Sequence, residues 1–372
     1  MKRSFWVSCI LAGYVVIRVG STLFPSIGAY VDPYYSEGIY KDFERVFNES
    51  QYRKTKDPAI IPDQTVFSYA AGAYLHGVDP ILVNSETTPL GKYFIAASIS
   101  ILKNDKFVAI PFGLVTLVSL FLLGKRIFRS TAWALVPIAV FSSDTLFLNQ
   151  LTTAPLLDII QLPFILLSLY VFIVEYPKQR FMFTALCLGL VMATKTHFPA
   201  FLLCITFVLF LIFQKRISSV WRLFLWLPVS LGVLVVSYTR TFLDGYSFIS
   251  FLGFQKWIIL YQKSKLLFPF SVWRLVFFNQ WQTWWGNMDV IPADDWQITW
   301  AIGTGLSLIL IYFILKKKLQ VSPYLFVLVW WVLLYGLFLS LGVVSSRFLL
   351  PFLPVAYILG TQAVRSFLGR HI

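Results

Sequence analysis

Apolar runs of roughly 17–20 residues recur along the chain, close to the length that an α-helix needs to cross the ~30 Å hydrocarbon layer of a membrane. Short turns containing lysine or arginine separate most of these runs. The pattern predicts about ten membrane-spanning helices, at residues 5–27, 107–123, 131–148, 154–174, 181–196, 198–213, 222–240, 297–315, 322–343 and 348–366. We therefore predict an all-α polytopic membrane protein in which residues 1–372 form a single integral membrane domain.

Two of the apolar runs differ from the others in length or in position. The run at residues 90–102 is only 13 residues long and has Lys92 near its start, so we predict an interfacial or re-entrant helix at the outer surface. The first run follows Met-Lys-Arg, as a signal peptide would. It contains Arg18 and lacks a small-residue cleavage site, so we predict a retained first helix.

Two long polar segments interrupt the apolar pattern, at residues 28–106 and 241–296. Loops of this length are uncommon in compact proteins unless they are functional. The first includes residues 32–88, which hold nine of the seventeen acidic residues. The second is rich in tryptophan, including Trp257, Trp281, Trp284 and Trp285, which suits helices lying in the headgroup layer. We expect interfacial helices in both outer loops and the active site in the first.

Composition and charge support a membrane location. The chain is 58% hydrophobic and 13% charged, whereas soluble domains carry about 25% charged residues. The net charge of +14 falls on one set of short turns, which hold 15 cations and one anion, Glu175. This distribution follows the positive-inside rule and predicts cytoplasmic termini, with both long loops outside. Topology thus explains the positive charge, and we expect membrane lipids rather than nucleic acid as partners.

Carboxylates stand at the start of the first outer loop. Asp32 and Glu37 lie just beyond the first helix, where a carboxylate could take a proton from an acceptor hydroxyl or amine. A solvated loop start with interfacial tyrosines is the alternative interpretation.

The first loop ends in the sequence Thr-Thr-Pro-Leu-Gly-Lys at residues 87–92, directly after Glu86. Pro89 suits the first turn of a helix, and Thr88 suits its N-cap. Lys92 then lies one turn into the helix, where a helix N-terminus and a lysine together can hold a lipid phosphate. An ordinary capped interfacial helix with a snorkelling lysine would give the same pattern.

Ionisable residues also occupy the predicted outer ends of three later helices. Asp158 begins one, Lys195 and His197 lie at the end of another, and Arg347 precedes the last. Ionisable groups near lipid are costly unless they are paired or face a cavity. These residues suggest a polar cavity open to the outside, although simple anchoring at the interface is the alternative. A lone histidine such as His197 is more often packed or hydrated than bound to a metal.

The order of these motifs resembles the GT-C superfamily of membrane glycosyltransferases, particularly the protein O-mannosyltransferase and aminoarabinose lipid A transferase branch. The resemblance covers most of the chain and rests on order and spacing. It is carried by Asp32 and Glu37, then by residues 87–92, 123–128, 152–158, 189–195 and 347–354. The chain departs from the family pattern at Thr87 and Thr88, which replace a histidine and a proline. Ser36 also stands where one alignment expects an acid.

The resemblance implies an inverting glycosyltransferase that moves a sugar from a polyprenyl-phosphate donor to a protein, lipid or glycan acceptor at the outer membrane face. Asp32 or Glu37 would act as the general base. Lys92, Lys195 and Arg347 would bind the donor phosphate, and Glu86, Asp158 and His197 would orient sugar or acceptor. No cofactor is identified, although a divalent cation is compatible with this site. A bacterial or archaeal plasma membrane is the expected location.

Other classes fit parts of the same pattern. A flippase or transporter for a lipid-linked glycan would use the outer cations for binding alone, but we detect no internal repeat of the kind that transporters often show. A membrane acyltransferase or phosphotransferase would need a compact histidine or serine motif, and the chain has three histidines. A noncatalytic subunit with the same fold would account for the departures from the family motifs.

Overall fold

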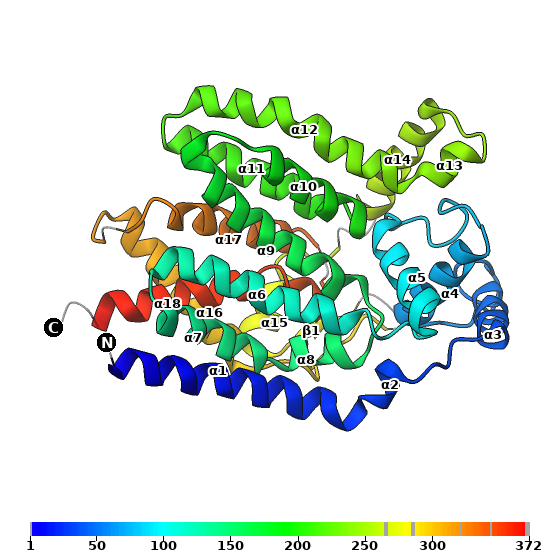
Figure 1. Cartoon of the computed structure of the whole chain (residues 1–372), viewed down its shortest axis with the longest axis horizontal. Coiled ribbons are helices and arrows are strands. Elements are labelled where there is room, and N and C mark those ends of the chain that lie inside the picture. Colours follow the sequence, from blue (N-terminus) through cyan, green and yellow to red (C-terminus); the bar gives the residue numbers. More distant parts are fainter. Residues whose placement is uncertain (1, 264–266, 284–286, 320, 343, 369–372) are drawn as a thin grey trace.

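The computed structural model describes residues 2–263, 267–283, 287–319, 321–342 and 344–368, so Trp284 and Trp285 of the second loop lie outside the described residues. Five of its helices are long and apolar enough to cross a membrane. They are α1 (Lys2–Leu23, whose apolar stretch continues to Ser26), α6 (Ala109–Phe128), α9 (Leu157–Glu175), α12 (Ile217–Ser237) and α16 (Ile298–Leu315). Figure 1 shows these long helices running in broadly similar directions across the molecule. The predicted all-α polytopic fold is confirmed.

Shorter helices complete the bundle. They are α7 (Thr131–Ser142), α8 (Thr145–Thr152), α10 (Met182–Thr194), α11 (Phe198–Phe213), α17 (Leu325–Leu339) and α18 (Leu353–Leu368). The predicted span 131–148 is divided, because α7 and α8 are bent by 62°. Asp144 caps α8 by accepting a hydrogen bond from the Leu146 amide. Counting this pair as one span gives six crossings by length, and the remaining predicted spans form helices of 13–16 residues.

The first long loop, residues 28–106, folds into short helices. After η1 (Phe24–Ser26), which continues from α1, they are α2 (Gly28–Val31), α3 (Glu37–Asn48), α4 (Asp63–Leu75) and α5 (Leu90–Leu102). The bounds of α5 coincide with the predicted 13-residue run, and the left-handed conformation of Lys103 ends the helix. In the N-terminal half of this loop, Ser36 caps α3 by accepting a hydrogen bond from the Ile39 amide.

The second long loop, residues 241–296, also contains regular structure in its described part. It forms α13 (Thr239–Leu243), α14 (Phe248–Lys263) and α15 (Ser271–Phe278), followed by an antiparallel pair, β1 (Trp281–Gln282) and β2 (Val290–Ile291). In this pair Trp281 lies opposite Ile291. Two short 3-10 helices, η2 (Tyr176–Lys178) and η3 (Ser346–Leu349), connect helices of the bundle.

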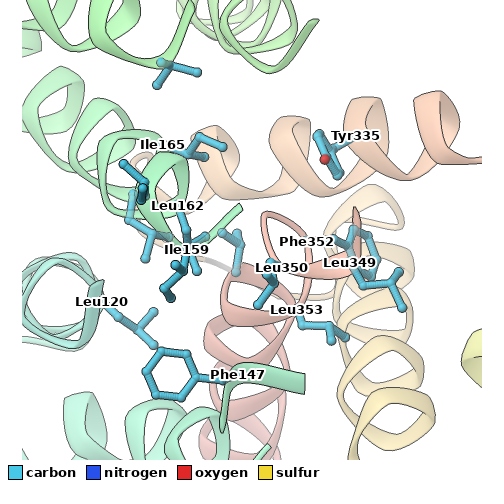
Figure 2. Close-up of a cluster of buried hydrophobic side chains, with 14 of the residues drawn as sticks. Leu120, Phe147, Ile159, Leu162, Ile165, Tyr335, Leu349, Leu350, Phe352 and Leu353 are labelled. Carbon is cyan, nitrogen blue, oxygen red and sulfur yellow. The ribbon is translucent and has the colours of Figure 1, made fainter. Parts of the chain in front are cut away.

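Apolar side chains gain little free energy by moving from lipid to a helix interface, because both surroundings are apolar. Close van der Waals packing therefore holds the central helices together. Figure 2 shows Leu120 of α6 and Phe147 of α8 beside Ile159 and Leu162 of α9, all fully buried. Leu349 and Leu350, which follow Arg347, are also fully buried in this region. The core therefore anchors the segment that carries Arg347 close to the start of α9.

The ends of the bundle differ. In Figure 1, α1 begins and α18 ends at one end, whereas α3, α4, α13 and α14 lie at the opposite end. These four helices of the two long loops thus gather at one end, which we call the loop end. The other, with the basic turns after α6, α11 and α16, we call the termini end. This arrangement is compatible with the predicted topology, which remains a prediction.

Candidate active site

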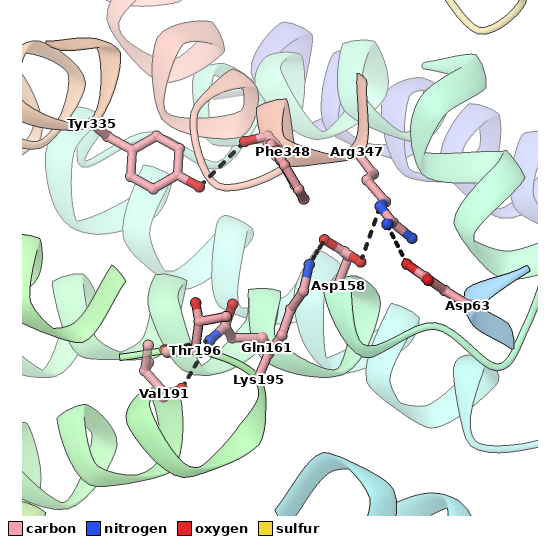
Figure 3. Close-up of polar contacts among 9 residues, drawn as sticks. All are labelled: Asp63, Asp158, Gln161, Val191, Lys195, Thr196, Tyr335, Arg347 and Phe348. Atoms are coloured by element: carbon pink, nitrogen blue, oxygen red, sulfur yellow. Dashed lines mark hydrogen bonds and ion pairs between the residues drawn. The ribbon is translucent and has the colours of Figure 1, made fainter. Parts of the chain in front are cut away.

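Four charged side chains meet near the start of α9, and we refer to them as the charged cluster: Asp63, Asp158, Lys195 and Arg347 (Figure 3). The Lys195 Nζ atom pairs with Asp158 Oδ1, and Arg347 Nη2 pairs with Asp63 Oδ2. Arg347 Nε lies 3.9 Å from Asp158 Oδ2. Carboxylates and cations therefore alternate along the cluster, which draws its members from four separate segments.

Helix ends position three of these groups. Asp158 lies in the first turn of α9 and Asp63 is the first residue of α4, so both carboxylates interact favourably with a helix N-terminus. Lys195 directly follows α10, and Arg347 lies in η3. Each member therefore points from the end of an element toward the space between elements, as a binding site requires.

The cluster keeps hydrogen-bonding capacity for a ligand. The side chains of Asp158 and Lys195 are 6% and 12% exposed, whereas those of Arg347 and Asp63 are 24% and 31% exposed, so the cluster opens on the Arg347 side. Arg347 Nε and Asp158 Oδ2 are buried and have no hydrogen-bond partner among the described residues. Because a guanidinium carries five N–H donors, Arg347 can bind an oxyanion while it keeps its contact with Asp63.

Neighbouring residues fix the two cations. The Phe348 ring lies 5.0 Å from Lys195 Nζ and 5.7 Å from the Arg347 guanidinium carbon, measured to the ring centroid. The Tyr335 hydroxyl donates to the Phe348 carbonyl at 3.3 Å (Figure 3). The Gln161 side-chain amide donates to the Val191 carbonyl at 2.9 Å and to the Thr196 carbonyl at 3.3 Å, which holds the segment around Lys195.

The second outer loop also supports the Arg347 segment. The Ser346 hydroxyl donates to Asp295 Oδ2 at 2.7 Å, and the Trp281 indole N–H donates to the Val344 carbonyl at 2.8 Å. Residues from both outer loops therefore reach the segment that carries Arg347.

Lys92 occupies a different position from the other two predicted phosphate ligands. Its ammonium is fully buried and donates to the Asn84 carbonyl at 2.7 Å, Asn84 Oδ1 at 3.3 Å and the Thr87 carbonyl at 3.0 Å. These acceptors match its three N–H donors. The same turn touches the site through its backbone, because the Thr88 amide donates to the Lys195 carbonyl at 3.0 Å. Glu86 accepts a hydrogen bond from the Asn84 side chain at 2.7 Å.

The two predicted bases lie at the start of the first loop. Asp32 is exposed at the end of α2. Glu37 begins α3 and pairs with His76 Nε2 at 2.9 Å and with Lys41 Nζ at 3.9 Å. Within the described ranges, no hydrogen bond or ion pair joins either carboxylate to the charged cluster.

His197 connects the site region to the second loop. Its Nε2 lies 3.0 Å from Gln255 Oε1 of α14, while its Nδ1 is buried without a hydrogen-bond partner in the described structure. Among the residues with defined placement, no group of three histidine, cysteine, aspartate or glutamate side chains is arranged to hold a metal ion.

Asp63 and Tyr52 were not among the residues predicted from sequence. Burial raises the pKa of the Tyr52 phenol, and the nearby carboxylates of Asp63 and Glu86 add to this shift. A signal for Asp63 exists in the sequence, because Pro62-Asp63 directly precedes an apolar helical segment, just as Asp158 does at the start of α9.

The Glu37–His76 pair predicts a pH-dependent contact between α3 and α4. The hydrogen bond of His76 Nδ1 with the Gly72 carbonyl, at 2.8 Å, and the Glu37 carboxylate raise the pKa of His76 against the opposing effect of partial burial. A raised pKa in the folded state stabilises the fold fully below the ordinary value of about 6.5, and this contribution is lost as pH rises through the raised value. We expect an NMR titration to place the His76 midpoint above 6.5 and Glu37→Gln to lower it; an unchanged midpoint in the variant would contradict this.

An apolar groove of about 640 Å³ lies between α5, α10 and α12. Its lining residues are Leu90, Tyr93, Leu190, Val229, Gly232, Val233, Val236, Ser237 and Thr239. Leu190 precedes Lys195 by five positions, or about 8 Å along a helix. Hydroxyl groups lie toward the loop end of the groove, and the rest of its lining is apolar.

The helical bundle and its charged cluster describe a polytopic membrane protein with a polar site at the ends of its helices. Residues 86–240 match the family model described as dolichyl-phosphate-mannose-protein mannosyltransferase. Among solved structures, ArnT from Cupriavidus metallidurans bound to undecaprenyl phosphate is similar, with 13% sequence identity and a TM-score of 0.59. The alignment covers 96% of this chain and 62% of the ArnT chain.

The likeness to ArnT establishes a shared fold, and this chain spans 62% of that longer protein. Comparison with curated proteins gives no match. The family model and the structural likeness together confirm the predicted resemblance to GT-C membrane glycosyltransferases.

Proposed function

We propose that the protein is an inverting glycosyltransferase that moves a sugar from a polyprenyl-phosphate donor to a protein, lipid or glycan acceptor. The observation that carries this proposal is the charged cluster, in which Lys195 and Arg347 converge beside Asp158 at the ends of their helices. The ArnT structure similar to this chain was determined with undecaprenyl phosphate, a lipid phosphate of the kind that such a donor would release. We place the reaction at the outer face of the membrane, following the predicted topology.

The chemistry explains why two cations are needed. The bond between the sugar's anomeric carbon and the donor phosphate oxygen breaks, and the phosphate leaves with the bonding electrons. A bond to the acceptor oxygen or nitrogen forms on the opposite face of the sugar, which inverts the configuration. The leaving phosphate gains negative charge as this bond breaks, so fixed cations at Lys195 and Arg347 would stabilise the transition state more than the bound donor.

A carboxylate of the first loop would accept the proton of the acceptor. Asp32 and Glu37 remain proposed bases, and we add Asp63, whose side chain is the more exposed of the two carboxylates in the charged cluster. Asp158, Glu86 and His197 would orient the cations, the sugar or the acceptor. Lys92, with its donors already occupied, is assigned here to holding the turn at residues 84–87 against the site.

We further propose that the groove between α5, α10 and α12 accepts part of the polyprenyl chain. Gly232 lines this groove, and a Cβ atom built there meets nothing within 4 Å. We expect Gly232→Phe to fill the groove without straining the helix and to raise the donor KM roughly tenfold, equivalent to about 1.4 kcal/mol. Gly305→Phe on α16 is the matched control, because Gly305 also has open space but does not line the groove. Equal donor KM values in the two variants would indicate that the polyprenyl chain binds elsewhere.

The function is tested by incubating the full-length protein in lipid nanodiscs with a panel of undecaprenyl-phosphate sugars. We expect one donor to be consumed, with release of undecaprenyl phosphate and transfer or hydrolysis of the sugar, measured by mass spectrometry. Binding of undecaprenyl phosphate without consumption of any donor would favour the flippase or noncatalytic subunit instead.

A further inference from the structure

A polar cavity lies at the termini end of the molecule, away from the charged cluster. It encloses about 400 Å³ between the end of α6, the start of α17 and the last turns of α18. Its polar lining consists of Arg129, Ser322, Gln362, Arg365 and Ser366, and none of the described residues that line it is acidic. A cavity with two guanidinium groups and no carboxylate in its wall favours an anion.

The contacts around the cavity position these donors. Arg365 Nη1 donates to the Phe128 carbonyl at 2.9 Å, which holds the guanidinium against the end of α6 and leaves its other N–H groups available. The Gln362 amide donates to the Ser366 hydroxyl at 3.0 Å. Leu325, the first residue of the 15-residue helix α17, also lines the cavity, so a helix N-terminus adds partial positive charge.

The position of the cavity indicates where its ligand comes from. The cavity lies where α6 and α18 end, beside the basic turns of the termini end, and its wall also includes the apolar side chains of Ile127, Val321 and Leu325. A volume of about 400 Å³ is in the range of small-molecule sites. Basic pockets between helix ends bind anionic lipid headgroups, whose acyl chains can continue along the apolar surface.

We propose that this cavity binds the phosphate ester of an anionic phospholipid headgroup. Arg129 and Arg365 contact the phosphate oxygens, and Ser322 and Gln362 contact the remaining polar atoms of the headgroup. This site is separate from the proposed donor site, so lipid binding and sugar transfer can be measured independently.

The test measures how much phosphatidylglycerol the full-length protein retains after purification from nanodiscs of equal phosphatidylglycerol and phosphatidylcholine, by native mass spectrometry. We expect the Arg129→Gln, Arg365→Gln double variant to retain about 25-fold less phosphatidylglycerol than the wild type, with phosphatidylcholine unchanged. The matched control is Arg216→Gln, Lys316→Gln, which removes two cations from turns of the same end without altering the cavity wall. This control is expected to retain wild-type amounts.

Equal retention in the wild type and the cavity variant would overturn the proposal, as would an equal loss in the control, which would indicate general attraction of anionic lipid to the basic end. Because Arg365 also bonds to the Phe128 carbonyl, exposed Arg129 is tested alone as well, with an expected loss of about fivefold.

In a second arm, delipidated protein is titrated with inorganic phosphate and with phosphatidylglycerol in micelles. Tighter binding of the lipid supports the proposal, whereas equal binding of free phosphate would overturn the lipid assignment.

Discussion

Replacing Arg347 by glutamine is expected to lower sugar transfer by about 10²–10³-fold, the loss typical of removing one group that stabilises developing negative charge. Arg347 contacts carboxylates from two separate segments, Asp63 and Asp158, and its buried Nε–H, 3.9 Å from Asp158, makes no hydrogen bond in the described structure. Glutamine keeps polarity and part of the length but removes the positive charge that would face the leaving phosphate. We therefore expect kcat to fall more than donor affinity.

Arg347→Lys separates charge from geometry in this experiment. It keeps the positive charge but loses the planar fork that can bind two oxygens at once, so an intermediate rate is expected. Arg274→Gln is the matched control, because Arg274 belongs to the second outer loop, is exposed and bonds to the Gln280 side chain. Transfer at the wild-type rate in folded Arg347→Gln would show that the leaving phosphate does not bind at the charged cluster.

The same substitution has a structural consequence that must be measured separately. Without Arg347, Asp63 loses its ion-pair partner and Asp158 keeps only Lys195. Removing one partner from this partly buried ion-pair cluster is expected to be destabilising. Thermal unfolding in nanodiscs and binding of undecaprenyl phosphate distinguish a protein that has lost its fold from one that has lost only its chemistry.

Much of the helical architecture can be predicted from sequence, because lipid leaves few choices for the backbone. Backbone groups in a lipid environment must be satisfied within the segment, so apolar runs of sufficient length become helices. The run at residues 90–102 becomes α5 with those bounds, and the left-handed Lys103 ends it. The break between α7 and α8 was missed because apolarity dominates residues 131–148, although Asp144 is a typical N-cap residue.

The site was only partly predictable for a different reason. Topology can assign Asp158, Lys195 and Arg347 to the same side of a membrane, and the structure does bring these three residues together. Which first-loop carboxylate reaches Arg347 depends on how α4 packs on the bundle, and this contact joins residues 284 positions apart. Motif order favoured Asp32 and Glu37, whereas the packing places Asp63 next to Arg347.

The contact between Asp63 and Arg347 makes Asp63 a candidate for the general base. Loss of a general base typically lowers turnover by ~10²–10⁴-fold. If Asp63 reaches the acceptor on the sugar face opposite the leaving phosphate, Asp63→Asn should show this loss in kcat, while Asp32→Asn and Glu37→Gln, singly or together, should have smaller effects. Asparagine keeps the shape of the side chain and can still accept a hydrogen bond from Arg347, so donor binding should remain largely intact.

Transfer kinetics and undecaprenyl-phosphate affinity of each variant provide the measurement, and Asp42→Asn is the matched control. Asp42 is an exposed carboxylate of the same loop, 3.5 Å from Arg45. A large loss in the Asp32→Asn, Glu37→Gln double variant, with normal turnover in Asp63→Asn, would assign the base to the start of the loop and leave Asp63 as a partner of Arg347. Parallel losses of turnover and lipid affinity in Asp63→Asn would show that Asp63 positions Arg347 rather than accepting a proton. Wild-type turnover in all of these variants would show that none of Asp32, Glu37 and Asp63 acts as the general base.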